Sequence, residues 1–370
     1  MSYILRESEL KDKNLISDLN EELKKNEILF QIPLPRDNES NKSDFIYIQN
    51  FVLFENENSI KGAYSLKNQL FKINNSLLRI GFYANPVSAG LFNKKYNICG
   101  VLLLNDANKR SPNIFCLGMG SYENSLPKLL KGLSWNFKTI PFYFKVYKPY
   151  NFLKNIAYLK DNKIKSFILF ILNFSGAGWI FIKLLNFFNY LFNFRFNKKI
   201  NIDVNEVSEF DDSVKYIWDN VNNFYIFTAV RNDVYLKSLY SSKKFIKLRF
   251  SHNNKVVGWS ISLCSELSNH KQFGSMKLGS IVDCFSLKNY ESIIIEKTSE
   301  LLKKKQVDLV VSNQSHIFWK KAFIKNSFIR GPSNFIFSPS KELSKKLNQN
   351  IKNNDFFHIT RGDGDGPINL

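Results

Sequence analysis

The chain has 370 residues, of which 44% are hydrophobic and 23% charged, and these ordinary values exclude a wholly disordered or low-complexity chain. Lysine and arginine outnumber aspartate and glutamate by 52 to 32, so the net charge is +20. Such a charge favours anionic partners: phosphate-bearing cofactors, acidic lipids or nucleic acid. Asparagine, lysine and isoleucine are also abundant, as AT-rich codons would produce, so the charge alone is a weak argument for nucleic acid.

The first half predicts alternating strands and helices. A short strand near the N-terminus precedes an amphipathic helix, in which Leu15, Ile16, Leu19 and Leu23 recur at helical spacing. Apolar runs bounded by turn residues predict the other elements, and Pro86 is expected to end one strand. These elements are two strands within 46–73, a strand at 76–86, a helix within 93–109, a strand within 112–120, a helix within 124–135 and an aromatic strand within 139–149.

The second half repeats this order. Asn253 and Asn254 mark a hairpin turn between two apolar strands, and Asp211 or Asp212 is expected to cap the first helix. The expected elements are a strand and helix within 204–221, a hairpin within 245–267, a strand at 278–287, a helix within 291–306, a strand at 307–313, a helix within 316–328 and a strand at 334–340.

The repeated order predicts a duplicated mixed α/β architecture. Each copy is expected to hold a mostly antiparallel central sheet flanked by helices. The expected organisation is an N-terminal domain at 1–156, an apolar helical linker at 157–200, a C-terminal domain at 201–346 and a tail at 347–370.

The linker contains a strongly apolar segment, 164–196. Its uncharged stretch, 167–182, has 16 residues, whereas a helix needs about 20 to cross a bilayer. A Ser-Gly-Ala-Gly sequence at 175–178 interrupts the stretch, so we expect two short helices rather than one spanning helix. Two interpretations remain open: helices that pack on the domains, or helices that contact an anionic membrane with their lysines at the phosphates.

Cysteine and histidine residues show no metal-ligand spacing. No C-x-x-C sequence occurs, and none of the four histidines forms a ligand-spaced pair, so we expect no metal site. The N-terminal segment is charged and lacks the apolar stretch of a signal peptide. The expected location is the cytoplasm, with a peripheral position at the inner face of the cell membrane if the apolar helices contact lipid.

The segment VDLVVSNQSHIFWKKAFIKNSF, at 307–328, resembles the end of the GNAT (N-acetyltransferase) fold. In that fold a buried strand ends in Asn, here Asn313, and the next helix carries an aromatic residue, here Phe318 or Trp319. The turn after the helix has Asn326 where glycine is usual, and both residue types accept left-handed dihedral angles.

The first half resembles the same fold at two places. IFCLGMGSYENSLPKLLKGLSW, at 114–135, occupies the place of the closing strand and helix. The preceding segment, 82–107, occupies the place of the acyl-CoA pyrophosphate loop and its helix. The whole chain therefore resembles a tandem GNAT protein of the bacterial surface-polysaccharide type.

This resemblance implies that acetyl-CoA or another acyl-CoA is the co-substrate and lies between two splayed strands. Its pyrophosphate needs small residues for close approach of the backbone. The first half offers one glycine for this, Gly90, and the matching stretch 283–292 offers none, so we expect the first half to hold acyl-CoA. The cofactor-binding residues implied are Asn85, Val87, Ser88, Ala89, Gly90, Lys94 and Asn313.

Three residues are candidates for catalysis. The resemblance implies a tyrosine near the last helix as proton donor, and Tyr122 holds that position. Asp283 lies in an apolar strand, where burial would raise its pKa and suit it to act as a general base. His316 is a second candidate base. Each also has a purely structural interpretation: a surface tyrosine, a strand-end carboxylate, and a histidine that covers a helical turn.

The tail Arg361-Gly362-Asp363-Gly364-Asp365 is either disordered or folds back over a site. In the second case its aspartates are expected to pair with lysine or arginine of this basic protein.

The function expected is that of an acyl-CoA-dependent N- or O-acyltransferase, and transfer of acetyl is favoured. Its acceptor would be a saccharide or amine, with the sugar or lipid-linked saccharide of cell-surface polysaccharide synthesis favoured. Two alternatives stay open: a Fem-like transferase that uses aminoacyl-tRNA, and a non-catalytic tandem GNAT scaffold. Lysine and arginine are spread along the chain without a nucleic-acid-binding motif, so no nucleic-acid partner is expected.

Overall fold

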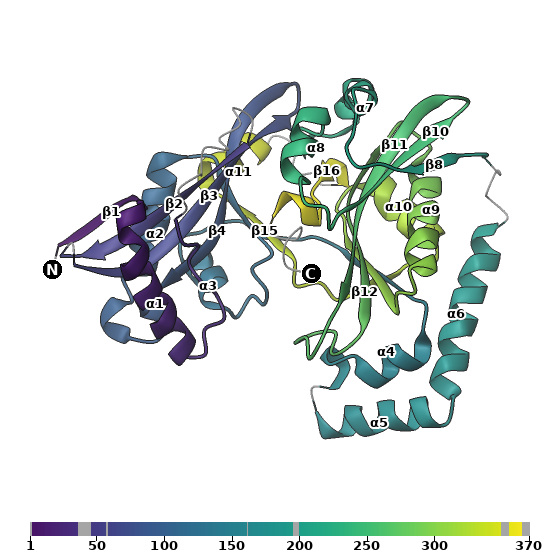
Figure 1. Cartoon of the computed structure of the whole chain (residues 1–370), viewed down its shortest axis with the longest axis horizontal. Coiled ribbons are helices and arrows are strands. Elements are labelled where there is room, and N and C mark those ends of the chain that lie inside the picture. The colour runs from purple at the N-terminus through teal and green to yellow at the C-terminus, as the bar shows by residue number, and fades with distance from the viewer. Residues whose placement is uncertain are drawn as a thin grey trace. The chain divides into compact units, whose positions relative to one another are not determined.

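The computed structural model describes residues 2–35, 46–56, 58–160, 162–194, 200–348 and 355–364. The chain forms two compact units (Figure 1). Unit 1 comprises Met1–Ile140, Phe227–Val230 and Asn334–Asn354, and unit 2 comprises Pro141–Ile226, Arg231–Ser333 and Asp355–Leu370.

Unit 1 contains a mixed, mostly antiparallel sheet with helices on both faces. Its strands run in the order β1-β2-β3-β4-β5-β15-β6, and β9 pairs with the end of β3. The elements are β1 (Tyr3–Glu7), α1 (Lys13–Lys25), β2 (Ile46–Glu55), β3 (Ser59–Ile73), β4 (Ser76–Ser88), α2 (Cys99–Arg110), β5 (Ile114–Leu117), α3 (Ser125–Gly132), β6 (Lys138–Thr139), β9 (Phe227–Ala229), β15 (Ile336–Pro339) and α11 (Lys341–Asn348).

The two faces of this sheet are covered by different helices because side chains alternate along each strand. On β2, Val52 packs with the apolar face of α1, whereas its neighbour Phe51 packs with α2 and α3. Both residues are at most 2% exposed, so the sheet is buried on both sides at this point.

Unit 2 contains a second sheet of the same kind, in the order β14-β7-β13-β12-β11-β10-β8. Its elements are β7 (Phe142–Val146), α4 (Pro149–Asn155), α5 (Lys163–Phe174), α6 (Ala177–Phe194), β8 (Asp203–Glu206), α7 (Ser213–Val221), α8 (Asp233–Leu239), β10 (Ile246–His252), β11 (Lys255–Glu266), β12 (Lys277–Ser286), α9 (Glu291–Lys304), β13 (Leu309–Asn313), α10 (Ile317–Lys325), β14 (Ile329–Gly331) and β16 (Phe357–His358). The expected architecture, two units that each contain a mostly antiparallel sheet flanked by helices, is thus confirmed.

The compact units are interleaved along the chain and so differ from the consecutive ranges expected. β7 lies between β13 and β14 in the sheet of unit 2, and β15 lies between β5 and β6 in the sheet of unit 1. The apolar pattern of a segment predicts that it forms a strand. Contacts between residues far apart in the chain determine which strand it pairs with. The linker helices and the described part of the tail also belong to unit 2.

A turn of the same type ends one helix in each unit. After α3, Ser134 takes a left-handed φ of 60°, and after α10, Ser327 takes a φ of 63°. In each case the next residue donates its N–H five residues back, from Trp135 to Leu130 and from Phe328 to Phe323, at 3.0 Å. This is the Schellman motif, and it corrects the expectation that Asn326 would take the left-handed position.

The linker forms two helices, as expected. α5 ends at Phe174, Gly176 has a φ of 74°, and α6 begins at Ala177. No single helix in the described part of the chain has the length and apolar composition to cross a membrane, but Lys163–Phe174 and Ala177–Leu184 meet both criteria together, bent by 81°.

Candidate functional site

In unit 1, the middle of β4 is paired with the start of β5, and the two strands are not paired beyond this point. The parallel register joins Gly81 to Ile114 and Phe82 to Phe115, and β4 then continues to Ser88, two residues past its expected end. Among the described residues, no strand pairs with this edge of β4 beyond Phe82. This edge of β4 therefore lacks a strand partner in the described part of the chain.

A β-bulge accompanies this separation. Asn85 and Pro86 together oppose the single residue Tyr64, because the register shifts between the pairs on either side. Asn85 has a φ of 47°, which asparagine tolerates better than most residues. A bulge bends its strand and raises its twist, so it accounts for β4 turning away from β5.

Five phenylalanines close the point where the two strands separate. Phe82 stacks on Phe115 with ring centroids 5.4 Å apart, and Phe71 meets Phe115 edge-on at 5.5 Å. Phe227 and Phe337 complete the cluster. Each of the five rings is at most 2% exposed, so side chains close the end of the gap at which the two strands meet.

The loop after β4 contains the small residues predicted to approach a pyrophosphate. Ser88 and Ala89 are buried, and Gly90 is partly buried. A Cβ on Gly90 would lie 2.6 Å from the carbonyl oxygen of Tyr96, well inside van der Waals contact. Gly90 is thus required by the packing of the loop on itself, whether or not the loop binds phosphate.

The lysines in and beside this loop differ in their ion pairs. Lys61 and Lys95 each lie 3.9 Å from the carboxylate of Glu55, to which the Tyr96 hydroxyl donates a hydrogen bond of 3.0 Å. Lys94 is exposed and has no ion pair within the described ranges. It is therefore the loop cation best placed to meet an anion from solvent.

Tyr122 lies in the loop between β5 and α3. Its ring packs edge-on against Phe137 at 5.8 Å, and its hydroxyl is 2.7 Å from that of Thr139. The side chain is 47% exposed. Tyr122 lies just before α3, which is where the sequence predicted it, and its side chain is open to solvent.

In unit 2, the corresponding strands separate in the same way. β12 and β13 are paired up to Ile281 and Ser312, and Val282 is an extra residue in the register with β11. Past this point the C-terminal segment runs beside the chain that follows β13. Gln314 pairs with Thr360 in an isolated antiparallel bridge.

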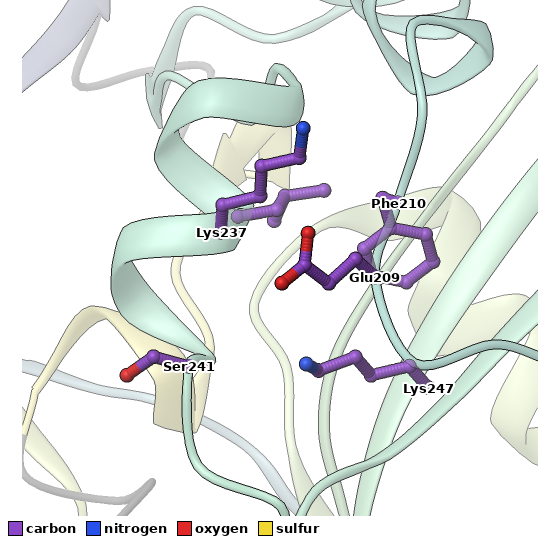
Figure 2. Close-up of a pocket in the computed structure, with 6 residues that line it drawn as sticks. Glu209, Phe210, Lys237, Ser241 and Lys247 are labelled. Atoms are coloured by element: carbon purple, nitrogen blue, oxygen red, sulfur yellow. The ribbon is translucent and has the colours of Figure 1, made fainter.

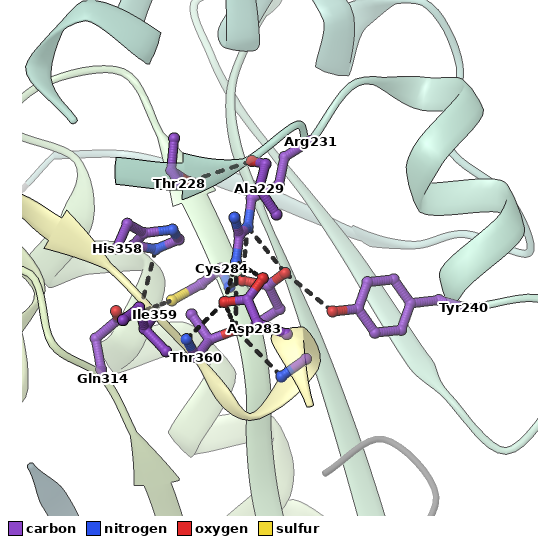
Figure 3. Close-up of polar contacts among 12 residues, drawn as sticks. Thr228, Ala229, Arg231, Tyr240, Asp283, Cys284, Gln314, His358, Ile359 and Thr360 are labelled. Atoms are coloured by element: carbon purple, nitrogen blue, oxygen red, sulfur yellow. Dashed lines mark hydrogen bonds and ion pairs between the residues drawn. The ribbon is translucent and has the colours of Figure 1, made fainter. Parts of the chain in front are cut away.

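The other side of the C-terminal segment contacts β12. His358 is hydrogen-bonded to the backbone of Cys284 and packs edge-on against Phe285 at 5.4 Å. The Gln314 amide bridges the two sides, since it lies 3.8 Å from the Cys284 sulfur and 3.3 Å from the His358 ring (Figure 3). The separation between β12 and β13 is therefore occupied by the chain's own C-terminal segment.

A buried ion cluster holds this segment. The Arg231 guanidinium donates to the Asp283 carboxylate at 3.0 Å and to the Asp363 carboxylate at 2.9 Å. The Tyr240 hydroxyl donates to Asp283 at 2.9 Å (Figure 3). Thr360 and Asp363 cap the short turn at Arg361–Asp363, and the Thr360 N–H donates to Asp363 at 2.8 Å. The expected pairing of a tail aspartate with a basic residue is confirmed for Asp363, whereas Asp365 lies outside the described residues.

Asp283 is 2% exposed rather than half-buried. Burial raises the pKa of its carboxyl from 3.8 to about 6, although the Arg231 charge opposes this shift. Both carboxylate oxygens accept hydrogen bonds, from Arg231, Tyr240 and the Cys284 N–H. A carboxylate engaged in this way has no free oxygen for an acceptor's proton, so these contacts favour a positioning role.

His316 and Asn313 are buried in unit 2. His316 caps α10, accepting a hydrogen bond from the Phe318 N–H through Nδ1 at 3.3 Å. Asn313 donates to the carbonyl of Pro141 at 3.3 Å. His316 therefore covers the first helical turn, which is the structural interpretation weighed for it.

A small pocket in unit 2 lies between the segment that precedes α7, the helix α8 and the strand β10. Glu209, Phe210, Lys237 and Lys247 are among its lining residues (Figure 2). Lys247 donates to the carbonyl of Ser208 at 2.7 Å. The cavity of about 70 Å³ is well below the usual size of cofactor pockets.

The predicted site residues thus divide between the two units. Asn85, Val87, Ser88, Ala89, Gly90, Lys94 and Tyr122 belong to unit 1, and Asp283, Asn313 and His316 belong to unit 2. Neither Arg231 nor Tyr240 was predicted as a site residue, and the only sequence signal was an arginine directly after the largely apolar run 224–230. Within the described ranges, no three His, Cys, Asp or Glu residues gather to hold a metal ion.

Comparison with known proteins gives fold likenesses only. No model of a protein family matches the chain, and a search of curated protein sequences finds no match. Among solved structures, a protein of unknown function from Enterococcus faecalis V583, described as a probable N-acyltransferase, is similar with a TM-score of 0.53 and 9% identity, over 94% of this chain and 74% of that one.

Two further structures are similar over most of the chain. N-myristoyltransferase of Saccharomyces cerevisiae with bound myristoyl-CoA has a TM-score of 0.51 at 9% identity, over 92% of this chain and 82% of that one. A GCN5-related N-acetyltransferase from Anabaena variabilis has a TM-score of 0.50 at 8% identity, over 91% and 72%. At these identities the likeness concerns the fold, and the chain has the fold of GNAT-type N-acyltransferases.

Proposed function

We propose that this protein is an acyl-CoA-dependent N- or O-acyltransferase that holds its acyl-CoA in unit 1. The observation that carries the proposal is the contrast between the two strand separations. In unit 1 the edge of β4 beyond Phe82 has no strand partner among the described residues. In unit 2 the matching place is occupied by the C-terminal segment, which is held there by Arg231.

Unit 1 offers suitable groups for each part of the cofactor. The pantetheine amides can pair with backbone groups on the free edge of β4, as an added strand would. The diphosphate would lie at the loop from Ser88 to Ile98, where Lys94 supplies charge and α2 begins at Cys99. Anions favour this end of a helix because of its unpaired N–H groups and dipole.

The proposed reaction requires few catalytic side chains. The acceptor nitrogen or oxygen forms a bond to the thioester carbonyl carbon, and the carbon–sulfur bond then breaks. The acceptor loses a proton, and the departing coenzyme A thiolate takes one up. Tyr122 is the proposed proton donor to the thiolate. Asp283 and His316 are engaged in structural contacts, so the proposal assigns them no proton transfer.

A short acyl group, with acetyl favoured, fits unit 1 best. The acyl end of a cofactor bound along β4 would point toward Phe82 and Phe115, where the strands rejoin. The phenylalanine cluster fills that region with buried rings. A long chain would have to displace them, at a cost that grows with every methylene group forced into a packed core.

We further propose that the acceptor is a sugar amine or hydroxyl, carried on a lipid-linked saccharide of cell-surface polysaccharide synthesis. Two observations support this class. The net charge of +20 suits diphosphate carriers, and α5 and α6 expose many apolar side chains. Such an enzyme would work at the cytoplasmic face of the membrane.

Calorimetric titration with acetyl-CoA and with palmitoyl-CoA tests the cofactor and its place. We expect one acetyl-CoA per chain, and weaker binding of the longer thioester. Lys94→Glu should weaken acetyl-CoA binding about tenfold, because it places a like charge beside the diphosphate. Lys109→Glu, at the far end of α2, is the matched control and should bind as the wild type does.

Gly90 is unsuitable for this test, since any side chain there would collide with the Tyr96 backbone. Two acetyl-CoA molecules per chain, or equal effects of the two lysine variants, would contradict the assignment to unit 1. Absence of acyl-CoA binding altogether would overturn the proposed function.

A further inference from the structure

The helices α5 and α6 expose an apolar surface unlike that of a typical soluble domain. On α5, Phe167, Phe170 and Phe174 lie at i, i+3 and i+7, and are 63%, 63% and 85% exposed. Ile180 and Phe181 on α6 are each at least 60% exposed. Contiguous exposed patches of this kind mark interaction sites.

This surface, which we call the elbow surface, is held firmly by unit 2. Leu169 is buried against Phe152, Leu278 and neighbouring core residues. The Trp179 indole N–H donates to the Asn173 side chain at 2.7 Å across the break between the helices. One side of the elbow is thus fixed to the core of unit 2, and its other aromatic and aliphatic side chains are exposed.

The charged residues of the two elbow helices have one sign. No aspartate or glutamate occurs from residue 162 to residue 202. Lys163 begins α5 and Lys183 lies in the second turn of α6, and both are exposed. Cationic residues beside exposed aromatic groups match the two layers of an anionic membrane surface, its phosphates and its acyl chains.

We propose that the elbow surface inserts into one leaflet of an anionic lipid bilayer. The phenylalanines enter the boundary between headgroups and acyl chains, and the lysines lie at the phosphates. A second copy of the chain fits this surface less well, because the lysines would face one another across a two-fold axis with no acidic residue between them. The inference goes beyond the acyl transfer proposed above and does not depend on it.

The test uses the full-length protein and sucrose-loaded vesicles, without acyl-CoA. We expect co-sedimentation with vesicles of phosphatidylglycerol and phosphatidylcholine, and weaker binding to pure phosphatidylcholine. The double variant Phe170→Glu/Phe174→Glu should lose at least tenfold in affinity. Lys163→Gln/Lys183→Gln should reduce the preference for anionic vesicles and leave binding to phosphatidylcholine unchanged.

The matched control is Leu29→Glu/Leu77→Glu, which changes two apolar residues of unit 1 that are 90% and 60% exposed. This control should bind vesicles as the wild type does. Circular dichroism should be unchanged in all variants, since every substituted side chain is exposed.

The proposal would be overturned if the wild type failed to sediment with anionic vesicles. Equal loss of vesicle binding in Phe170→Glu/Phe174→Glu and in the control Leu29→Glu/Leu77→Glu would also overturn it. It would also be overturned if sedimentation velocity showed a dimer that only the α5 variant dissociated, with no lipid binding. Vesicle binding and acyl-CoA titration are separate measurements, so a negative result in one does not contradict the proposal that the other tests.

Discussion

At the scale of single residues, Tyr122 is the side chain on which the proposed chemistry depends. Tyr122→Phe removes the hydroxyl and keeps the ring packed on Phe137. Loss of a positioned proton donor costs on the order of 100-fold in rate, so thiol release from acetyl-CoA in the presence of amino sugars should fall by about that factor. Calorimetric binding of acetyl-CoA should be unchanged. Tyr216→Phe, also on the surface, is the control, and equal rates for the two variants would refute the assignment.

Asp283 gives the fold a pH dependence with a definite sign. Its folded-state pKa is raised to about 6 from 3.8, so the folded chain binds an extra proton between these values. The resulting stability is fully present below the unfolded-state pKa and is lost as pH rises through about 6. Asp283→Asn lacks this titration because its side chain is neutral throughout.

The free energy of unfolding of the wild type, relative to Asp283→Asn, should therefore increase as pH falls from 7 to 4.5. Urea denaturation of both proteins at the two pH values measures this difference. A difference that stays constant, or shrinks on acidification, would show that Asp283 does not titrate as its burial indicates.

At the scale of elements, the C-terminal segment depends on one glycine. A Cβ on Gly362 would lie on the Tyr240 hydroxyl, which also donates to Asp283. Gly362→Ala should therefore push this segment away from β12 and destabilise unit 2 by about 2 kcal/mol or more. Hydrogen exchange of the amides at 357–363 should become faster.

Gly132→Ala in α3 is the matched control, since a Cβ there meets nothing within 4 Å. Alanine is favoured over glycine in helices, so this variant should be as stable as the wild type or slightly more stable. If Gly362→Ala left exchange at 357–363 unchanged, the packing of this segment against Tyr240 would not be what holds it.

Sequence patterns predicted most elements well, because the forces that form a helix or a tight turn act over a few residues. The hairpin turn at Asn253 and Asn254 is confirmed, and both residues have left-handed φ values, of 50° and 60°. The C-terminal end of β4 lies two residues beyond the predicted end at Pro86. This is because Pro86 lies in a bulge, where a missing N–H costs no ladder hydrogen bond.

At the scale of the whole molecule, each unit of the duplicated architecture contains two neighbouring strands that separate. The two separations differ in whether another segment of the chain fills them. In unit 1, β4 keeps an edge that has no strand partner among the described residues beyond Phe82. In unit 2, a segment more than 70 residues further along the chain than Asp283 fills the equivalent place. The duplication therefore supplies one proposed cofactor site and one self-filled counterpart.

The sequence by itself determined the repeated order of strands and helices, the two linker helices and the fold class. It did so because apolar periodicity, capping residues and turn residues act locally. The tertiary structure alone decided that β7 and β15 join sheets outside their own halves, and that Arg231 bridges Asp283 and Asp363. Strand pairing and the burial of charge depend on residues far apart in the chain, and no local pattern specifies which distant partner will offset the cost of burying an arginine.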